Sequence, residues 1–355
     1  MKKTVLILAL VLTTSLTFAQ DAVVATPPAT TITGSADMYY KYDFSDQQGN
    51  GLTSFTNSHN SFELGMASLQ AAHKLGKGSV FVDLGFGKRA SEFSYNDGSM
   101  TFMIKQLTFT YDITDKFKVV AGSFATHIGY ELVDAIGNKN YSMSYAFTNG
   151  PFFNTGVKAV YTSGKLSFMA GVTNPTDFKT AMEAGSTQKT FIGQIGYTGS
   201  TGSAYFNVTS GSANPNPAFQ GGSDKNATQF DIVASKKLND KFSLGFNGTY
   251  RMISDDFDST LDGNWFSLVG YANYTVKDNL SIAYRMEYFS VDEYLSPPDG
   301  LNIFANTLSL NYKVGNLTII PEIRYDSSSE DTFIDSDALP TAGNGYILLA
   351  TTYSF

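Results

Sequence analysis

The chain has 355 residues, a formal net charge of −8 at pH 7 and no cysteine, which excludes disulfides, thiolate metal sites and a lipid-modified N-terminal cysteine. The acidic balance argues against nucleic acid as a partner, because a phosphate backbone needs a basic surface. The 28 Phe, 21 Tyr and 32 Gly residues, with 16% charged residues, suit an aromatic-girdled barrel with many turns better than a cytosolic enzyme.

The first 19 residues have the layout of a secretory signal peptide. Lys2 and Lys3 precede an apolar core over residues 5–12, and a small-residue site ends at Ala19, so we expect cleavage after Ala19. The core is too short for a retained membrane anchor, and no later segment approaches the roughly 18 apolar residues of a spanning helix. We therefore expect a short linker over residues 20–31, followed by residues 32–355 as one domain.

Residues 32–355 alternate between apolar and polar side chains in segments of about ten residues, a pattern typical of strands with one face on lipid and one on water. In residues 32–44, Ile32, Met38 and Tyr40 share one side, whereas Asp37 and Lys41 share the other. The alternation recurs over residues 80–86, 166–172, 242–252 and 280–288. A soluble β-sandwich would reverse the two faces.

The connections favour an all-β, transmembrane antiparallel barrel, because short periplasmic turns should alternate with long outer loops. Short turns occur at residues 75–78, 114–116, 163–165, 199–202, 238–241, 277–278 and 315–316. Long polar stretches occupy residues 45–60, 88–100, 125–153, 174–189, 211–226, 254–263, 291–302 and 327–344. Their number predicts about 16 strands, an even number that returns both ends to the periplasmic side.

Two places fit this alternation poorly. The apolar phase of residues 62–73 changes near Ser68, which predicts a bulge there. Pro321 lies within an alternating segment, and a closed barrel has no free edge. It must therefore lie at a bulge or forfeit one ladder hydrogen bond.

The last eleven residues, GYILLATTYSF, end on Phe355 and resemble the closing strand of outer-membrane proteins. Residues 104–161 resemble the porin-like outer-membrane barrel family widespread in Bacteroidota, above all over residues 122–131, 140–144 and 150–158. The resemblance implies passive passage of small hydrophilic solutes, a barrel embedded in outer-membrane lipid, and recognition of the terminal strand by the barrel-assembly machinery. Family members often carry Arg where Met143 stands, so any role of that cation is absent or moved here.

A barrel of about 16 strands is wide enough for an aqueous channel, so a selective pore needs a constriction. The longest loop, residues 125–153, could fold inward and bring the acidic groups of Glu131 and Asp134 with it. The alternative is a loop that covers the outer rim. By analogy with porins of this size, we expect the inward position.

The strand alternation assigns several charged residues to the lumen, where charge can face water. At about 3.3 Å per residue and a tilt near 40°, Arg285 and Arg324 lie roughly 13 and 18 Å above their turns, whereas Arg251 lies near 23 Å. A basic ladder facing Glu131 and Asp134 would orient dipolar solutes and set ion preference.

Other charged side chains could extend or cancel this basic ladder. Glu287 and Glu322 lie two residues from Arg285 and Arg324 on the same faces, so neutralising ion pairs are an equal alternative. Lys105 and Lys158 could join the basic wall.

Enzymatic and cofactor-based functions find little support. His59, His73 and His127 are the chain's three histidines, two in expected loops and one beside a turn, and no Ser/His/Asp arrangement is visible. Acidic groups cluster in two outer loops, Asp255, Asp256, Asp258 and Asp262 in one and Glu330, Asp331, Asp335 and Asp337 in the other. Calcium would suit these oxygens, but neither run has an EF-hand pattern. We therefore expect solvated acidic loops and no cofactor.

A second function class stays open at this point. The barrel could be an inert structural or adhesion anchor whose outer loops bind a partner, such as a surface lipoprotein, or it could form a homo-oligomer. Energised uptake is disfavoured, because residues 20–31 leave no room for a plug domain before the first strand. Single-channel conductance separates the channel from the anchor.

Overall fold

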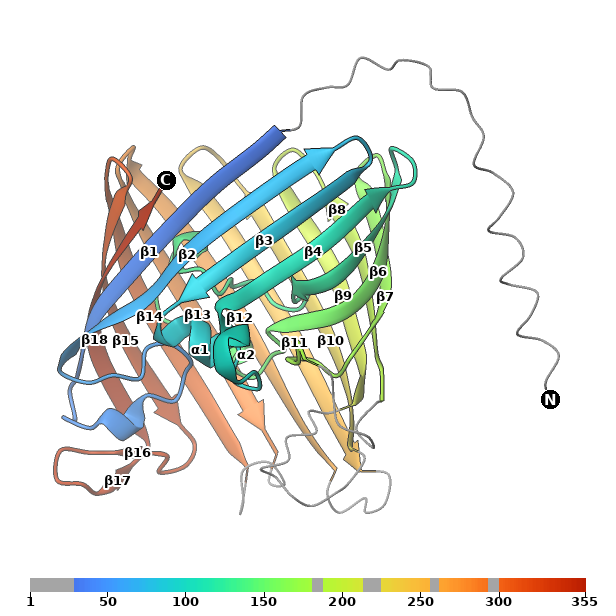
Figure 1. The fold of residues 1–355 in the computed structure, drawn as a ribbon. Coiled ribbons are helices and arrows are strands. Elements are labelled where there is room, and N and C mark those ends of the chain that lie inside the picture. The colour runs from blue at the N-terminus through green and yellow to red at the C-terminus, as the bar shows by residue number, and fades with distance from the viewer. Residues whose placement is uncertain (1–28, 181–187, 213–224, 256–261, 293–299) are drawn as a thin grey trace, which may run out of the picture.

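The computed structural model describes residues 29–180, 188–212, 225–255, 262–292 and 300–355. The expected signal peptide and most of the expected linker lie outside these residues. Sixteen antiparallel strands close into one barrel in the order β1-β18-β15-β14-β13-β12-β11-β10-β9-β8-β7-β6-β5-β4-β3-β2 (Figure 1). The predicted fold class and strand number are thus confirmed. In the part described, no helix is long and apolar enough to span a bilayer.

The barrel strands, in chain order, are β1 (Ala29–Asp43), β2 (Ser61–Leu75), β3 (Gly78–Phe86), β4 (Ile104–Asp112), β5 (Phe117–Ala125), β6 (Phe153–Ser163), β7 (Leu166–Thr173), β8 (Thr190–Thr198), β9 (Gly202–Ser212), β10 (Lys225–Lys237), β11 (Phe242–Asp255), β12 (Gly263–Lys277), β13 (Leu280–Val291), β14 (Leu301–Val314), β15 (Leu317–Ser328) and β18 (Gly343–Ser354). The smaller elements are α1 (Lys88–Phe93), α2 (Tyr145–Thr148), the 3-10 turns η1 (Gln48–Asn50), η2 (Ser99–Met103) and η3 (Ala135–Gly137), and the hairpin of β16 (Phe333–Ile334) and β17 (Pro340–Thr341).

Short turns and long loops lie at opposite ends of the barrel. All seven predicted turns join consecutive strands at the end where Phe355 also lies, the upper end in Figure 1. The long connections gather at the other end, with the β16–β17 hairpin among them. We call the end with the short turns the inner end and the end with the long connections the outer end.

The last strand shows why the sequence alternates. On β18, Ile347, Leu349 and Tyr353 point outward with exposed fractions near one half, whereas Leu348 and Ala350 on the inner face are at most 2% exposed. Outward apolar side chains suit contact with lipid, and closure of the barrel satisfies the backbone donors that lipid cannot.

Both predicted irregularities are present, one of them shifted. On β2, Gly65 and Met66 together oppose Asp37 of β1, which makes a bulge two to three residues before the expected Ser68. The β14–β15 pairing is interrupted between Glu322 and Ile319, where Pro321 lacks the amide hydrogen that the ladder needs.

Candidate pore constriction

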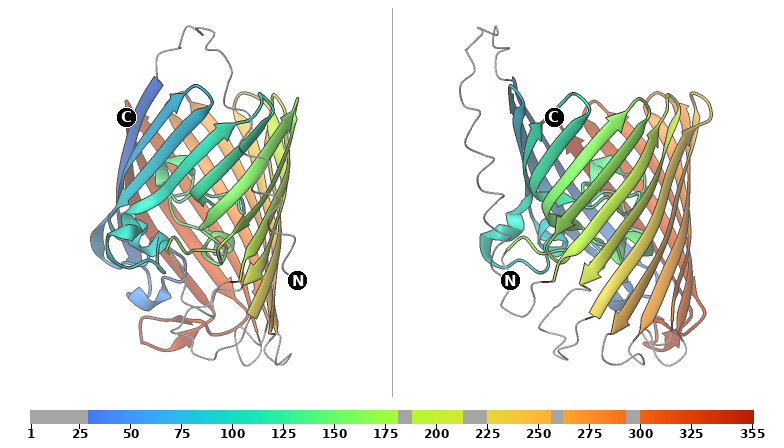
Figure 2. Two further views of the ribbon diagram at one scale, coloured as in Figure 1. Left: turned by 45° about the vertical axis from the view of Figure 1, so that its right-hand side comes forward. Right: turned by 90° about the vertical axis from the view of Figure 1, so that its right-hand side faces the viewer.

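Residues 126–152, which we call the inner loop, lie inside the barrel and not over its rim. His127 Nε2 is 2.9 Å from the carbonyl oxygen of Val208 on β9, and the ring of Tyr130 stacks on Tyr271 of β12 with centroids 4.2 Å apart. Tyr141 is fully buried. Both views in Figure 2 show this green segment within the ring of strands. The inward position expected of this loop is therefore the one it adopts.

Two buried carboxylates of the wall hold the inner loop by its backbone. Glu322 accepts the amides of Tyr141 (2.7 Å) and Ser142 (3.2 Å), and Glu287 accepts those of Tyr145 (2.8 Å) and Ala146 (2.7 Å). Each also accepts a serine hydroxyl from a neighbouring strand, Ser309 for Glu322 and Ser267 for Glu287. Charge-assisted bonds of this kind offset the cost of burying the carboxylates.

The two mid-height arginines lie beneath the inner loop, each 1% exposed. Arg285 Nη1 is 2.6 Å from Glu131 Oε1, and Arg324 Nε is 2.7 Å from Asp326 Oδ1. Both guanidinium groups also donate to the carbonyl oxygen of Met143, at 3.2 and 2.7 Å. Arg285 therefore meets Glu131 directly, whereas the ion preference expected of these arginines stays a prediction.

The other acidic residue of the inner loop binds the opposite wall. Asp134 lies 2.6 Å from Lys105 Nζ on β4, and Lys105 is also 3.0 Å from Asp83 of β3. The basic ladder suggested by the sequence would place Asp134 opposite the arginines. The structure differs, because the loop turns back toward β2–β4 after Glu131 and places Asp134 beside the buried Lys105.

Lys158 and Arg251 differ from these paired cations. Neither has a carboxylate oxygen within 4.0 Å among the described residues. Lys158 Nζ lies 3.8 Å from the centroid of the Phe124 ring. In the part described, these two positive side chains of β6 and β11 thus make no direct ion pair.

Five side chains on this part of the wall have buried polar atoms with no hydrogen-bond partner among the described residues. This polar belt consists of Asn154 on β6, Thr190 on β8, Thr209 on β9, Gln229 on β10 and Arg251 on β11. The strand register places Gln229 directly between Thr209 and Arg251. Buried polar groups are normally satisfied, so this row of unpaired donors and acceptors distinguishes the belt from the rest of the wall.

The belt separates two cavities of the lumen. The outer cavity, of about 840 Å³, includes Arg251, and the inner cavity, of about 410 Å³, includes Asn207 and Val233. Asn207 precedes the belt residue Thr209 by two positions on β9, on the same face of the strand. The belt therefore lies on the wall between the levels of the two cavities.

A half-buried histidine of the inner loop, His127, lies against the wall near this level. Burial lowers the pKa of His127 to about 4, with a smaller contribution from the positive charge of Lys158. The ring is therefore neutral at pH 7 and donates from Nε2 to the carbonyl oxygen of Val208. His59 and His73 bond elsewhere, to Asp46 and to Thr30.

The described part of the chain has no group of three or more His, Asp or Glu side chains that could hold a metal ion. In the second acidic loop, Asp335 instead accepts the amides of Asp337 and Leu339 within the β16–β17 hairpin. Of the first acidic cluster, Asp256 and Asp258 lie outside the described residues.

Sequence reasoning missed some features of this site. Arg89 on α1 is 1% exposed and donates to the carbonyl oxygen of Val133 (3.1 Å), yet its position in a polar loop suggested solvent. Gly245 on β11 was also missed, although a Cβ there would lie 2.7 Å from Tyr130 Cζ. A glycine within an alternating strand is a signal of close approach, and this one could have been noticed.

Comparisons with known proteins agree with this architecture. A family model described as putative beta-barrel porin-2, OmpL-like, matches residues 29–355. An anion-selective porin from Comamonas acidovorans superposes with a TM-score of 0.64 at 12% identity, covering 92% of this chain and 100% of that one.

Two further solved structures have the same fold. A loop-deletion mutant of OmpT of Vibrio cholerae superposes with a TM-score of 0.62 at 12% identity, covering 93% of this chain and 100% of that one. The outer membrane channel DcaP of Acinetobacter baumannii superposes with a TM-score of 0.59 at 12% identity, covering 92% of this chain and 97% of that one. No curated protein matches the sequence.

Proposed function

This chain belongs to the putative beta-barrel porin-2, OmpL-like family, and we propose that it is a channel, not an enzyme, through which small hydrophilic solutes diffuse passively. Its closed barrel lies in the outer membrane. The observation that carries the proposal is that the lumen holds an outer and an inner cavity, both lined in part by the inner loop, with the polar belt on the wall between their levels.

The constriction in this proposal lies between the inner loop and the polar belt. Glu287 and Glu322 fix the loop, while Arg285, Arg324 and Lys105 are buried against it. These residues set the width of the passage by holding the loop in place. Their charges are compensated at short range, by Glu131, Asp326 and Asp134 among others.

The same distribution of charge sets the ion preference of the passage. Lys158 and Arg251 have no carboxylate oxygen within 4.0 Å in the ranges described, so their charges are compensated less closely than those of the paired cations. A fixed positive charge in a confined lumen attracts anions and repels cations. We therefore propose a weak preference for anions.

Conductance of the purified protein in planar lipid bilayers tests the channel. We expect stepwise currents, a reversal potential in a salt gradient that favours anions, and a lower conductance for Gln229→Trp, which places a large ring in the belt. The control is Phe230→Trp, a change at the neighbouring lipid-facing residue, 40% exposed. Its conductance should equal that of the unmodified protein.

Equal conductance in the two variants would contradict a passage along the belt. Absence of current from the correctly folded barrel would contradict the channel itself and favour the structural or adhesion anchor.

A further inference from the structure

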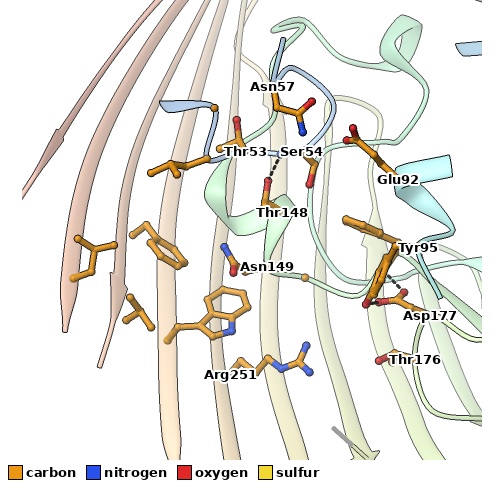
Figure 3. A pocket seen from close by; sticks show the side chains of 18 of the residues that line it. Thr53, Ser54, Asn57, Glu92, Tyr95, Thr148, Asn149, Thr176, Asp177 and Arg251 are labelled. Carbon is orange, nitrogen blue, oxygen red and sulfur yellow. Dashed lines mark hydrogen bonds between the residues drawn. The ribbon is translucent and has the colours of Figure 1, made fainter. Parts of the chain in front are cut away.

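The outer cavity has one apolar wall and one polar wall (Figure 3). The apolar wall comes from the outer ends of β11–β14 and consists of Ile253, Trp265, Phe289, Val291 and Leu301. The polar wall comes from residues 51–57 and from the inner loop, with Thr53, Asn57 and Asn149 among its side chains. At about 840 Å³ the cavity is of the size that holds small organic molecules.

Arg251 stands at the edge of this cavity with unused donor capacity. Its Nε is buried and has no hydrogen-bond partner among the described residues. The other three arginines, Arg89, Arg285 and Arg324, each lie within 4.0 Å of a carboxylate. In Figure 3 the Arg251 side chain extends toward the space below Tyr95 and Asp177. A planar guanidinium in this setting is suited to bind a carboxylate through two parallel hydrogen bonds.

The acidic residues of the cavity are already engaged by the protein. Asp177 accepts the amides of Phe152 (2.7 Å) and Phe153 (3.0 Å) and the hydroxyl of Tyr95 (2.9 Å). Burial also raises the pKa of Asp177 above its ordinary value. Glu92 accepts the amide of Phe55 at 2.9 Å. No ion pair within 4.0 Å joins Arg251 to either carboxylate, and Asp177 acts on the guanidinium only through its charge at longer range. The guanidinium can therefore still donate hydrogen bonds to a ligand.

We propose that the outer cavity is a binding site for small monocarboxylates with an apolar body. The carboxylate binds Arg251, and the apolar body lies against Ile253, Trp265 and the neighbouring wall. This inference names the solute class of the channel and rests on the proposed function. Wall and cation are adjacent, since Arg251 pairs with Trp265 in the β11–β12 ladder.

Trp265 supplies the measurement, because it is the single Trp of the chain and lines the cavity. The full barrel in detergent is titrated with cyclohexanecarboxylate, which does not absorb where tryptophan is excited. We expect a saturable change in fluorescence. Cyclohexylmethanol and cyclohexylmethylamine, which have the same ring without the carboxylate, should bind about tenfold more weakly or worse. Acetate, which lacks the ring, should give no change.

Two variants test the role of Arg251. Arg251→Gln should weaken binding of cyclohexanecarboxylate about tenfold, to the level of the alcohol, and Arg251→Lys should retain part of the preference. Lys241→Gln removes one positive charge from an exposed residue of an inner-end turn and should change nothing. Heat-modifiable migration on gels shows that each barrel is folded; should Arg251→Gln not fold, Arg251→Lys and the ligand series decide.

Equal binding of the carboxylate and the alcohol, or tighter binding of the amine, would overturn the inference. So would unchanged affinity in a folded Arg251→Gln barrel. The bilayer measurement separates this inference from the proposed function. Conductance without carboxylate binding leaves the channel and refutes the site, whereas binding without conductance refutes the channel and leaves the site.

Discussion

The inner surface of the barrel has two contrasting regions. On β13–β15, charged side chains are buried and each has partners: Arg285 with Glu131, Arg324 with Asp326, and Glu287 and Glu322 with loop amides. On β6–β11, the polar belt has buried donors and acceptors without partners in the part described. The comparison teaches that the charged groups of β13–β15 hold the inner loop in place, whereas the polar groups of the belt are left without such partners.

The largest expected effect is on conductance, and it follows from releasing the inner loop from the two arginines that bind it. Arg285→Ser combined with Arg324→Ser removes the arginine donors from Glu131, Asp326 and the carbonyl group of Met143. We expect conductance to rise about twofold or more and the reversal potential to shift toward cations. Planar-bilayer recordings measure both.

The matched control for this pair is Lys236→Ser with Lys241→Ser, which removes two exposed positive charges near the inner-end turns. Conductance and selectivity that stay unchanged in the arginine pair would show that these residues do not hold the constriction.

The next largest effect is on stability, and it contrasts the lipid-facing and lumen-facing sides of β10. Ile232 on β10 points to lipid and is 48% exposed, whereas Val233 lines the inner cavity. Ile232→Arg should lower the free energy of unfolding by about 2–4 kcal/mol near the bilayer midplane. Val233→Arg should cost clearly less, because its charge reaches water. Denaturant titration in lipid vesicles gives both values, and equal costs would contradict the assignment of faces.

A smaller effect on stability is expected when the hydroxyl group is removed from one of two buried tyrosines. Tyr145 donates to Asp326 at 2.8 Å, whereas the hydroxyl of Tyr271 has no partner among the described residues. Tyr145→Phe should lower the free energy of unfolding by about 1–2 kcal/mol, since the buried carboxylate loses a donor. Tyr271→Phe should be close to neutral. The same titration measures both, and a larger cost at Tyr271 would reverse the comparison.

The smallest expected effect is a pH dependence at the border of the two regions. Burial lowers the pKa of His127 from 6.5 to about 4. Its contribution to stability is therefore fully present above about pH 6.5 and is lost as the pH falls toward 4. His127→Gln should reduce the loss of melting temperature between pH 7 and pH 4.5. An identical loss in the variant would show that other groups account for it.

The architecture was predictable because its signals are local. A strand alternates every two residues and a tight turn needs particular residue types, so the strand number and all seven turns could be deduced from segments of about ten residues. The bulge at Gly65 and Met66 was predicted two to three residues too late, because both faces of that strand carry apolar side chains.

The partners of the charged residues were beyond such reasoning. Tyr141 and Glu322 are 181 residues apart in the chain, and nothing local in the sequence indicates that one binds the other. The same holds for Asp134, whose partner Lys105 was assigned to the basic wall but not to this carboxylate. Lumen assignment followed from periodicity, whereas pairing depends on the path of the inner loop.

Glu287 and Glu322 hold the inner loop by the amides of residues 141, 142, 145 and 146, and not by their side chains. Every residue type except proline carries that amide. At these four positions the amide contact itself does not restrict the side chain, so a substitution there can change the chemistry presented to a solute while the contact to the wall stays the same. Such an attachment separates the evolution of selectivity from the evolution of shape, and a designer could use this barrel as a fixed frame for new pore linings.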